Sequence, residues 1–567
     1  MAAISAEAPS KGKVTGIEYQ HPAAFKFGVA AVTVGVILHL PFYFSARHNA
    51  PLAGVGRYHL LGQKPDASMW IGMLLIFVGL AATAYGVFPR LSTVSRGYVS
   101  KIRVRALDAA PLKPSHVALL LVMAAAITID VMKPVTLAFI APGAAAEYGL
   151  KSPLNPTAHA LPVALYPLFG ISGTVIGSFM WGYFGDKIGR RASILLAAII
   201  FIAVAVCGAM PVFWANLVVC FIMGVGVGGM LPITFALMAE TIPARHRGWL
   251  MVLIGGDVAG AYIICSTLAS TIASPEHFGW RMLWWVSLPT GLVLMVLNRF
   301  IPESPRFLLQ HGRDEEARAI MQRYGAEVTA GDDSLLKVEE HVRSRFAQLF
   351  SREFVGLSVI VLLLGLGIGI VQYGFQQWIP SNLQKLGLTS VSASSILRDS
   401  ALIGFPFVLP IAYLYGFWSA KKTIILMATV TTAAMIGFAT IGSSHLIHDG
   451  KATALLYLLL VGPIWGIQGL TAVSVAYASE VFPTKVRSRG TGLAAGATKF
   501  GGVLILATVV AAIAAPSIRS TALIGAIPLI LAIVAMMVFG VETKKKQLER
   551  ITAEELHQAV PAVLPPV

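Results

Sequence analysis

The sequence has little charge and few cysteines. Only 12% of its 567 residues are Asp, Glu, Lys or Arg, whereas 56% are hydrophobic. Soluble domains carry about 25% charged residues, so this composition excludes an ordinary soluble enzyme and a disordered chain. The three cysteines, Cys207, Cys220 and Cys265, all lie inside apolar runs. They support neither a disulfide framework nor a zinc site, and we expect no metal and no cofactor.

Long apolar runs take the place of the missing charge. A membrane-spanning helix needs about 20 apolar residues, and fourteen windows of about that length can be placed along the chain. Their limits are 25–46, 69–89, 116–140, 162–184, 192–210, 213–239, 249–273, 281–299, 354–378, 396–418, 423–442, 453–477, 490–515 and 519–540. The sequence therefore predicts an all-α polytopic membrane protein with fourteen spans in a lipid bilayer.

Acidic residues are outnumbered by basic ones, and the excess lies on one side of these spans. Lys and Arg number 43 against 27 Asp and Glu, which in a soluble chain would suggest a nucleic-acid partner. With the N-terminus placed inside, 32 of the basic residues fall in the inner segments and 9 in the outer ones. Cytoplasmic loops retain Lys and Arg, so both termini are expected in the cytoplasm and no nucleic-acid partner is expected.

The chain contains an internal duplication. A shift of 240 residues places GVGVGGMLPITFALMAE at 224–240 on IWGIQGLTAVSVAYASE at 464–480 without a gap. Glu240 then meets Glu480, and Arg247 meets Arg487. Two six-helix halves follow. The predicted divisions are a cytoplasmic tail at 1–24, a two-helix extension with a basic loop at 25–115, a first half at 116–299, a connecting loop at 300–352, a second half at 353–541 and a tail at 542–567.

A glycine-rich basic turn, GYFGDKIGRR, connects two spans of the first half at 182–191. Gly182 allows two helices to approach closely, and Asp186 can cap a helix or pair with a base. Arg190 and Arg191 are expected at the cytoplasmic edge of the membrane.

This turn resembles the loop signature Gly-x-x-x-Asp-x-x-Gly-Arg-Arg of the major facilitator superfamily. PESPRFLL at 302–309 and VETKKKQLE at 541–549 are similar to stretches of its sugar-porter and organic-ion branches. The resemblance covers about residues 116 to 549 and implies a carrier whose central site opens alternately to each side. It also implies a gating motif that steadies one closed state, with these candidate residues: Gly182, Asp186, Gly189, Arg190, Arg191, Glu240, Arg247, Glu480 and Arg487.

Three departures from the family pattern bear on the mechanism. The corresponding loop of the second half, YGFWSAKKT at 415–423, lacks the Asp, so we expect an asymmetric gate that depends chiefly on the first half. Cys220 stands where the fourth helix of the family often has Arg, so proton coupling cannot be carried over from that position. The span containing GIVQYGFQQWIP at 369–380 lacks the Gln-Gln-x-x-Gly-x-Asn arrangement of the sugar branch, which favours a small organic ion over a sugar.

Four ionisable side chains are expected deep inside spans, where each costs about 2.5–3.5 kcal/mol on insertion scales. Asp130 and Lys133 share one helix face; either they neutralise each other, or Asp130 carries a coupling proton. Asp257 and Lys499 each follow the glycine of an Arg-Gly pair by nine residues. Either they form a buried bridge, or Lys499 meets a substrate carboxylate while Asp257 is linked to the proton.

The first span of the second half adds hydrogen-bonding groups. Gln372 and Gln376 form one i,i+4 pair, and Tyr373 and Gln377 form another on a neighbouring face. Trp378 fits either a stacked aromatic ligand or an interfacial position. Trp465 and Gln468 are weaker candidates of the same kind.

These observations predict a secondary active transporter that moves a small organic solute, with an anion favoured, by alternating access and proton symport. The alternatives are a facilitative uniporter of a sugar or an organic cation, and a non-transporting receptor built on a carrier fold. No Walker lysine motif and no catalytic cluster occur in the sequence, so neither ATP-driven transport nor enzyme activity is expected. We expect a monomer in a bacterial inner membrane, with a small-molecule substrate and protons as its partners.

Overall fold

The computed structural model describes residues 20–88, 110–157, 160–256, 258–326, 346–441, 446–448, 451–482, 484–511 and 518–543. Within these residues, twelve helices are long and apolar enough to cross a membrane. The predicted spans at 162–184 and 281–299 correspond to shorter apolar helices, Leu165–Trp181 and Met282–Asn298. The structure therefore supports a polytopic helical membrane protein, and the count of fourteen spans stays a prediction.

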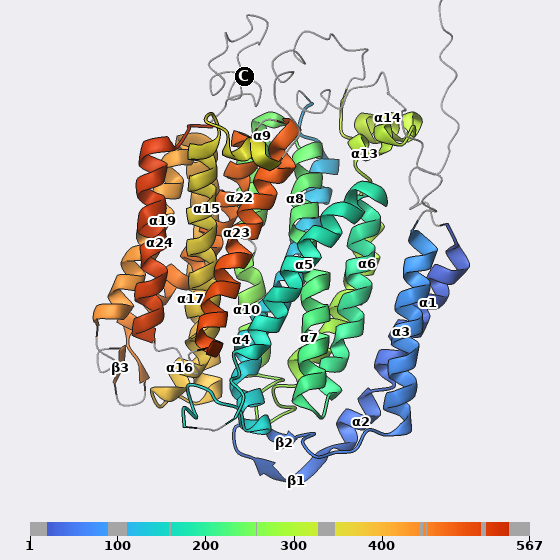
Figure 1. Cartoon of the computed structure of the whole chain (residues 1–567), viewed down its shortest axis with the longest axis vertical. Helices are drawn as coiled ribbons and strands as arrows, with labels where there is room; N and C mark the ends of the chain where they lie inside the picture. The colour runs from blue at the N-terminus through green and yellow to red at the C-terminus, as the bar shows by residue number, and fades with distance from the viewer. Residues whose placement is uncertain are drawn as a thin grey trace, which may run out of the picture.

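The helices form an N-terminal extension and two larger sets (Figure 1). The extension contains α1 (Pro22–Ile37), α2 (Leu40–Ser45), β1 (Arg47–Leu52), β2 (Gly56–Tyr58) and α3 (Ala67–Val87). The first set, called the first half, contains α4 (Pro114–Tyr148), α5 (Leu165–Lys187), α6 (Arg190–Ala203), η2 (Val204–Ala209), α7 (Phe213–Val227), α8 (Met230–Thr241), α9 (Ala244–Gly256), α10 (Val258–Ser270), α11 (Met282–Trp285) and α12 (Ser287–Asn298).

The second half follows two short helices, α13 (Pro305–Gln310) and α14 (Asp314–Arg323), and the turn η3 (Phe346–Phe350). Its elements are α15 (Val355–Ile370), η4 (Val371–Phe375), η5 (Gln376–Trp378), α16 (Ile379–Lys385), α17 (Ser390–Gly404), η6 (Phe405–Phe407), α18 (Val408–Tyr413), η7 (Leu414–Trp418), α19 (Ala420–Thr440), β3 (Ile447–His448), β4 (Lys451–Ala452), α21 (Ala454–Val461), η8 (Gly462–Gly466), α22 (Ile467–Val481), α23 (Thr484–Ala511) and α24 (Ile518–Phe539).

The two halves meet along two seams. On one side α5 packs against α23, and on the other α10 packs against α17. The helices α13 and α14 lie at one end of the molecule, called the α14 end, and the β1–β2 hairpin lies at the opposite end, called the hairpin end (Figure 1). The helix α14, Asp314–Arg323, lies within the predicted connecting loop at 300–352.

Glycines spaced seven residues apart bring α1 and α3 into backbone contact. A Cβ on Gly28 would lie 2.6 Å from the Gly79 carbonyl oxygen, and a Cβ on Gly35 would lie 2.7 Å from that of Gly72. In hydrocarbon, small residues permit this close packing, which takes the place of a hydrophobic driving force. The pair packs onto α6, so the extension is attached to the first half.

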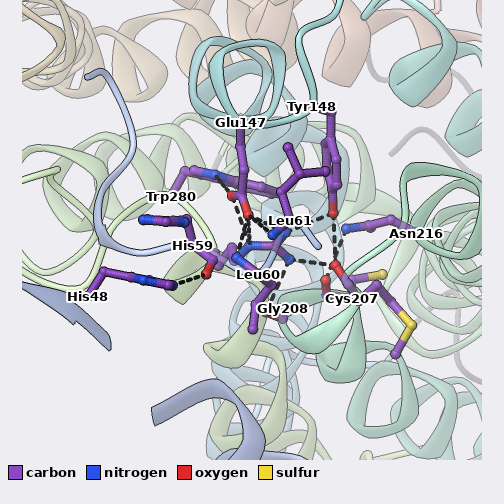
Figure 2. Close-up of polar contacts among 12 residues, drawn as sticks. His48, His59, Leu60, Leu61, Glu147, Tyr148, Cys207, Gly208, Asn216 and Trp280 are labelled. Atoms are coloured by element: carbon purple, nitrogen blue, oxygen red, sulfur yellow. Dashed lines mark hydrogen bonds and ion pairs between the residues drawn. The ribbon is translucent and has the colours of Figure 1, made fainter. Parts of the chain in front are cut away.

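A buried ion pair fastens the hairpin end of the extension to the first half. Glu147, in the last turn of α4, accepts from Arg281 Nη2 at 2.8 Å, and both side chains are fully buried. Glu147 also accepts from the backbone N–H of Leu60, at 2.7 Å, and from Trp280 Nε1, at 2.9 Å (Figure 2). Arg281 donates in turn to the Met210 carbonyl at 2.8 Å. One carboxylate therefore joins α4, the segment after β2 and the start of α11.

Removing the charge of Glu147 should unfold this end first. Glu147→Gln leaves the Arg281 guanidinium buried without a counter-ion, which costs about 3–5 kcal/mol. We expect a large fall in the melting temperature of the detergent-purified protein. The matched control is Glu316→Gln, because Glu316 pairs with Arg313 on α14 with more than a third of its side chain exposed. Such a pair contributes less than about 1 kcal/mol, so equal losses in the two variants would contradict the assignment.

Candidate transport site and gate

Asp130 lies at the centre of α4 with only 1% of its surface exposed. Its Oδ1 atom has no hydrogen-bond partner, although both Lys133 and Lys499 act on the carboxyl group electrostatically. Lys133 donates instead to Thr290 Oγ1 on α12 at 3.0 Å and lies over the Phe201 ring. An acid that is buried among cations and short of a direct partner is poised to exchange a proton or a ligand.

Lys499 reaches across the seam between the halves. From the middle of α23 its ammonium donates to the Gly228 carbonyl at 2.7 Å, to the Thr174 carbonyl at 3.3 Å and to the Ser178 hydroxyl. All three acceptors belong to the first half. Asp257, the proposed partner of Lys499, lies outside the described residues.

Buried polar side chains without partners gather on the broken helices of the second half. Gln376, Gln377 and Trp378 form η5, which packs against α4, and each has a side-chain nitrogen without a hydrogen bond. The same holds for Trp465 Nε1 on η8 and for both polar atoms of Gln468 on α22.

Leaving such groups unpaired costs about 1–3 kcal/mol each, so they fit a site where water or a guest molecule supplies the missing partners. Non-helical or distorted backbone at membrane depth is also typical of a substrate site in a transporter. Tyr373 is near enough to Asp130 to interact with it electrostatically. Gln372 is half-buried, and no contact brings it into this group.

The glycine-rich turn at 182–191 lies beside Glu303, which precedes α13. Gly189 has φ = 94° and caps α6; a Cβ there would strike Glu303 Oε2 at 2.3 Å. Glu303 Oε1 accepts from the backbone N–H of Arg190 at 2.7 Å. The carboxyl group of Glu303, in the motif PESPRFLL, thus caps the N-terminus of α6, where backbone N–H groups would otherwise be unpaired.

Glu240 belongs to the same polar cluster of the first half. It lies 3.9 Å from Arg190 Nη2 and accepts from Ser304 Oγ. Arg191 donates to the Asn298 carbonyl at 3.1 Å. The structure does not describe the side-chain surroundings of Gly182 and Asp186, so their roles in the gate stay predictions.

The second half repeats this arrangement with hydroxyl groups. Glu480 accepts from Tyr415 OH at 2.8 Å and from Thr543 Oγ1 at 2.7 Å. Glu542 accepts from the Ala420 N–H at 2.9 Å and from the Ser419 hydroxyl at the start of α19. In the second half, VETKKK therefore supplies a carboxylate next to the loop at 415–423, which lacks one. That the gate depends chiefly on the first half stays a prediction.

Arg247 and Arg487 are the two remaining gate candidates. Arg247 donates to the Ile242 carbonyl at 3.1 Å and acts electrostatically on Glu480. The side chain of Arg487 lies outside the described residues.

Sequence reasoning missed the roles of Glu303, Ser304 and Glu542. Each sits inside a motif that was used only to identify the family. The usable signal was the duplication, because the pairs Glu240–Ser304 and Glu480–Thr543 occupy matching places in the two halves.

Two sets of spanning helices that meet along two seams, with unpaired polar groups on broken helices, are typical of membrane transporters. The proton–xylose symporter XylE, bound to 6-bromo-6-deoxy-D-glucose, has this fold: its structure matches with a TM-score of 0.61 and 20% identity over 78% of this chain and 99% of that chain. The partially occluded inward-open structure of XylE from Escherichia coli matches with a TM-score of 0.59 and 19% identity, over 77% and 100%.

The chain belongs to the sugar (and other) transporter family, whose model matches residues 144–554. Among curated relatives, the niacin transporter NiaP of Acinetobacter baylyi is 27% identical over 67% of this chain and 86% of its own length. The metabolite transport protein YdjK of Escherichia coli, described as putative, is 27% identical over 69% and 86%. The protein is thus a transporter and not an enzyme.

Glu303 should give the protein a pH-dependent stability. Burial raises the pKa of Glu303 to about 7, and the N–H groups of Ser304, Arg190 and Arg191 only partly oppose this rise. Between about pH 4.5 and 7 the folded chain therefore keeps a proton that the unfolded chain has lost. Stability falls as the pH rises through this window, by up to about 3 kcal/mol at ~1.36 kcal/mol per pKa unit, and levels off above it.

Glu303→Gln should remove this slope. The measurement is the melting temperature between pH 4.5 and 8 for the wild type and the variant, with Glu316→Gln as a control that keeps the wild-type profile. Parallel curves for the wild type and Glu303→Gln would show that Glu303 titrates normally.

Proposed function

We propose that this protein is a proton symporter for a small organic anion that works by alternating access in a bacterial inner membrane. The observation that carries the proposal is Asp130, a carboxyl group at the centre of a spanning helix with an unpaired oxygen and two lysines within electrostatic range. Such a group can be neutralised by a proton in one state and by an ammonium in another. This exchange would couple proton movement to the reorientation of the halves.

The substrate class is inferred from the groups that lack partners. Three of them are N–H donors of Gln376, Gln377 and Trp378, which suit the oxygens of a carboxylate. Lys499 supplies the nearby positive charge. The relative NiaP is named for niacin, an aromatic carboxylate, which agrees with this choice.

We also propose a membrane topology, an oligomeric state and a gate. The α14 end is the cytoplasmic end, because the basic segments lie there in the predicted topology. The chain crosses the bilayer fourteen times, the extension contributing two spans, and functions as a monomer. The gate residues Gly189, Arg190, Glu240 and Glu303, with Glu480 in the second half, hold the cytoplasmic end closed in one state.

Uptake by purified protein in proteoliposomes tests the proposal. The panel contains niacin, a dicarboxylate, glucose and an organic cation, each with and without an acidic exterior. We expect accumulation of an organic anion that increases when the exterior is acidic. Uptake that ignores the pH gradient would instead indicate a facilitative uniporter, and binding without uptake would indicate a receptor.

Asp130→Asn should separate coupling from translocation. The amide cannot carry a proton, so we expect loss of pH-driven accumulation, whereas exchange of labelled for unlabelled substrate continues. Asp399→Asn is the matched control, because Asp399 also lies in a spanning helix but pairs with the adjacent Arg398 and is about 40% exposed. Accumulation by Asp130→Asn at the wild-type level would exclude Asp130 as the coupling group.

Gln468→Leu tests the unpaired amides. Because neither polar atom of Gln468 has a partner, replacement by a side chain of similar size should leave the melting temperature nearly unchanged. Loss of hydrogen bonds to a substrate should raise KM by about tenfold per bond. The control is Gln322→Leu on α14, and an unchanged KM in Gln468→Leu would place Gln468 outside the site.

A further inference from the structure

One of the oxygens that Lys499 binds is left without its helical partner by a proline. In an α-helix the carbonyl of residue i accepts from the N–H of residue i+4, so the Gly228 carbonyl would pair with residue 232. That residue is Pro232, which has no N–H. The spanning segment that contains α7 and α8 is also broken here, since α7 ends at Val227 and α8 begins at Met230. The Gly228 carbonyl is therefore free of its helical donor, and Lys499 donates to it at 2.7 Å.

Two further oxygens are brought to the same place by close packing. A Cβ on Gly228 would lie 2.4 Å from the Thr174 carbonyl oxygen, so only glycine lets α5 approach this closely. The Ser178 hydroxyl lies 2.8 Å from the Thr174 carbonyl oxygen and 2.7 Å from that of Gly228, and can donate its one hydrogen to either, while its own oxygen accepts from Lys499. The three donors of one ammonium thus meet three oxygens, which we call the Lys499 seat: Thr174 O, Ser178 Oγ and Gly228 O.

At the matching positions of the second half, the sequence lacks both the proline and the glycine of this seat. Under the shift of 240 residues, Pro232 corresponds to Ala472 and Gly228 to Gln468. The seat is therefore asymmetric: Lys499 of the second half donates to a carbonyl oxygen that Pro232 leaves free in the first half. Its oxygens are neutral, so the charge of Lys499 stays available to Asp130, which acts on it electrostatically.

We propose that Lys499 is a latch between the two halves, and that the seat freed by Pro232 holds the seam of α5 and α23 in the conformation seen here. This rests on the proposed alternating-access function. When the halves rock, the ammonium leaves the three neutral oxygens and turns to Asp130 or to the substrate anion. Lys499 then acts as a positioning residue for the conformational step as well as a cation for the ligand.

The test measures the separation of the halves and needs no transport. Spin labels are attached to cysteines placed at Ala50, an exposed residue of β1, and at Lys451, an exposed residue of β4, after the three buried cysteines are replaced. Both positions lie at the hairpin end of the molecule, one in each moving unit (Figure 1). The distance distribution is then recorded in lipid nanodiscs without substrate.

We expect Lys499→Met to lower the ratio of the present state to the alternative state about tenfold, the loss typical of hydrogen bonds from a charged group. Pro232→Ala restores an N–H that competes for the Gly228 carbonyl, and should shift the distribution in the same direction by less. Lys499→Arg should keep the wild-type distribution. Pro528→Ala is the matched control, because Pro528 also lies inside a spanning helix but within the second half alone.

The outcomes separate the latch from the transport proposal. Wild-type distributions in both Lys499→Met and Pro232→Ala, with melting temperatures showing folded protein, would overturn the latch. If Lys499→Met fails to fold, Pro232→Ala and Ser178→Ala decide the question. Failure of proton-driven uptake in proteoliposomes would overturn the proposed function but leave the distance result intact.

Discussion

The absence of water partners inside the membrane is the constraint on which this structure depends. Each buried polar group must find its hydrogen bonds within the protein, or be kept for a molecule that arrives later. The Glu147–Arg281 pair takes the first course: its guanidinium and carboxylate are surrounded by donors and acceptors from four segments. Asp130, Gln376 and Gln468 take the second course. The distinction divides the molecule into parts that stay fixed and parts that exchange partners.

The fixed and exchanging parts lie in different places. At the hairpin end the ion pair is fully buried and joins the extension to the first half alone. At the α14 end, the carboxylates of Glu240, Glu303, Glu480 and Glu542 cap helices and accept from hydroxyl groups at the margin of the bundle. The hydrogen bonds and helix-end interactions of these four carboxylates are each weaker than a buried ion pair. They suit a closure that opens in the proposed transport cycle.

The helical class, most spans and the repeat could be predicted because long apolar runs and a 240-residue shift are properties of the sequence alone. Asp130 and Lys499 could be found for the same reason, since a charge in an apolar run is conspicuous. The partners could not. Lys499 binds carbonyl oxygens of Thr174 and Gly228, and every residue has such a group, so no side-chain pattern marks them. Glu147 and Arg281 escaped notice because each sits at the end of a helix, where a charge looks like an ordinary loop residue.

The glycine-packed pair α1 and α3 changes what the lipid can sense. Because the pair covers α6, nearly all residues of the apolar window in Arg190–Ala209 are buried, although a helix at the edge of a bundle normally presents a broad face to acyl chains. Other helices of the first half still expose apolar side chains, among them Phe179 on α5, Val218 on α7 and Val296 on α12. The second half keeps its own lipid contacts on α19 and α24. Changes in bilayer thickness therefore reach α6 through α1 and α3, which separate this one helix from direct lipid contact.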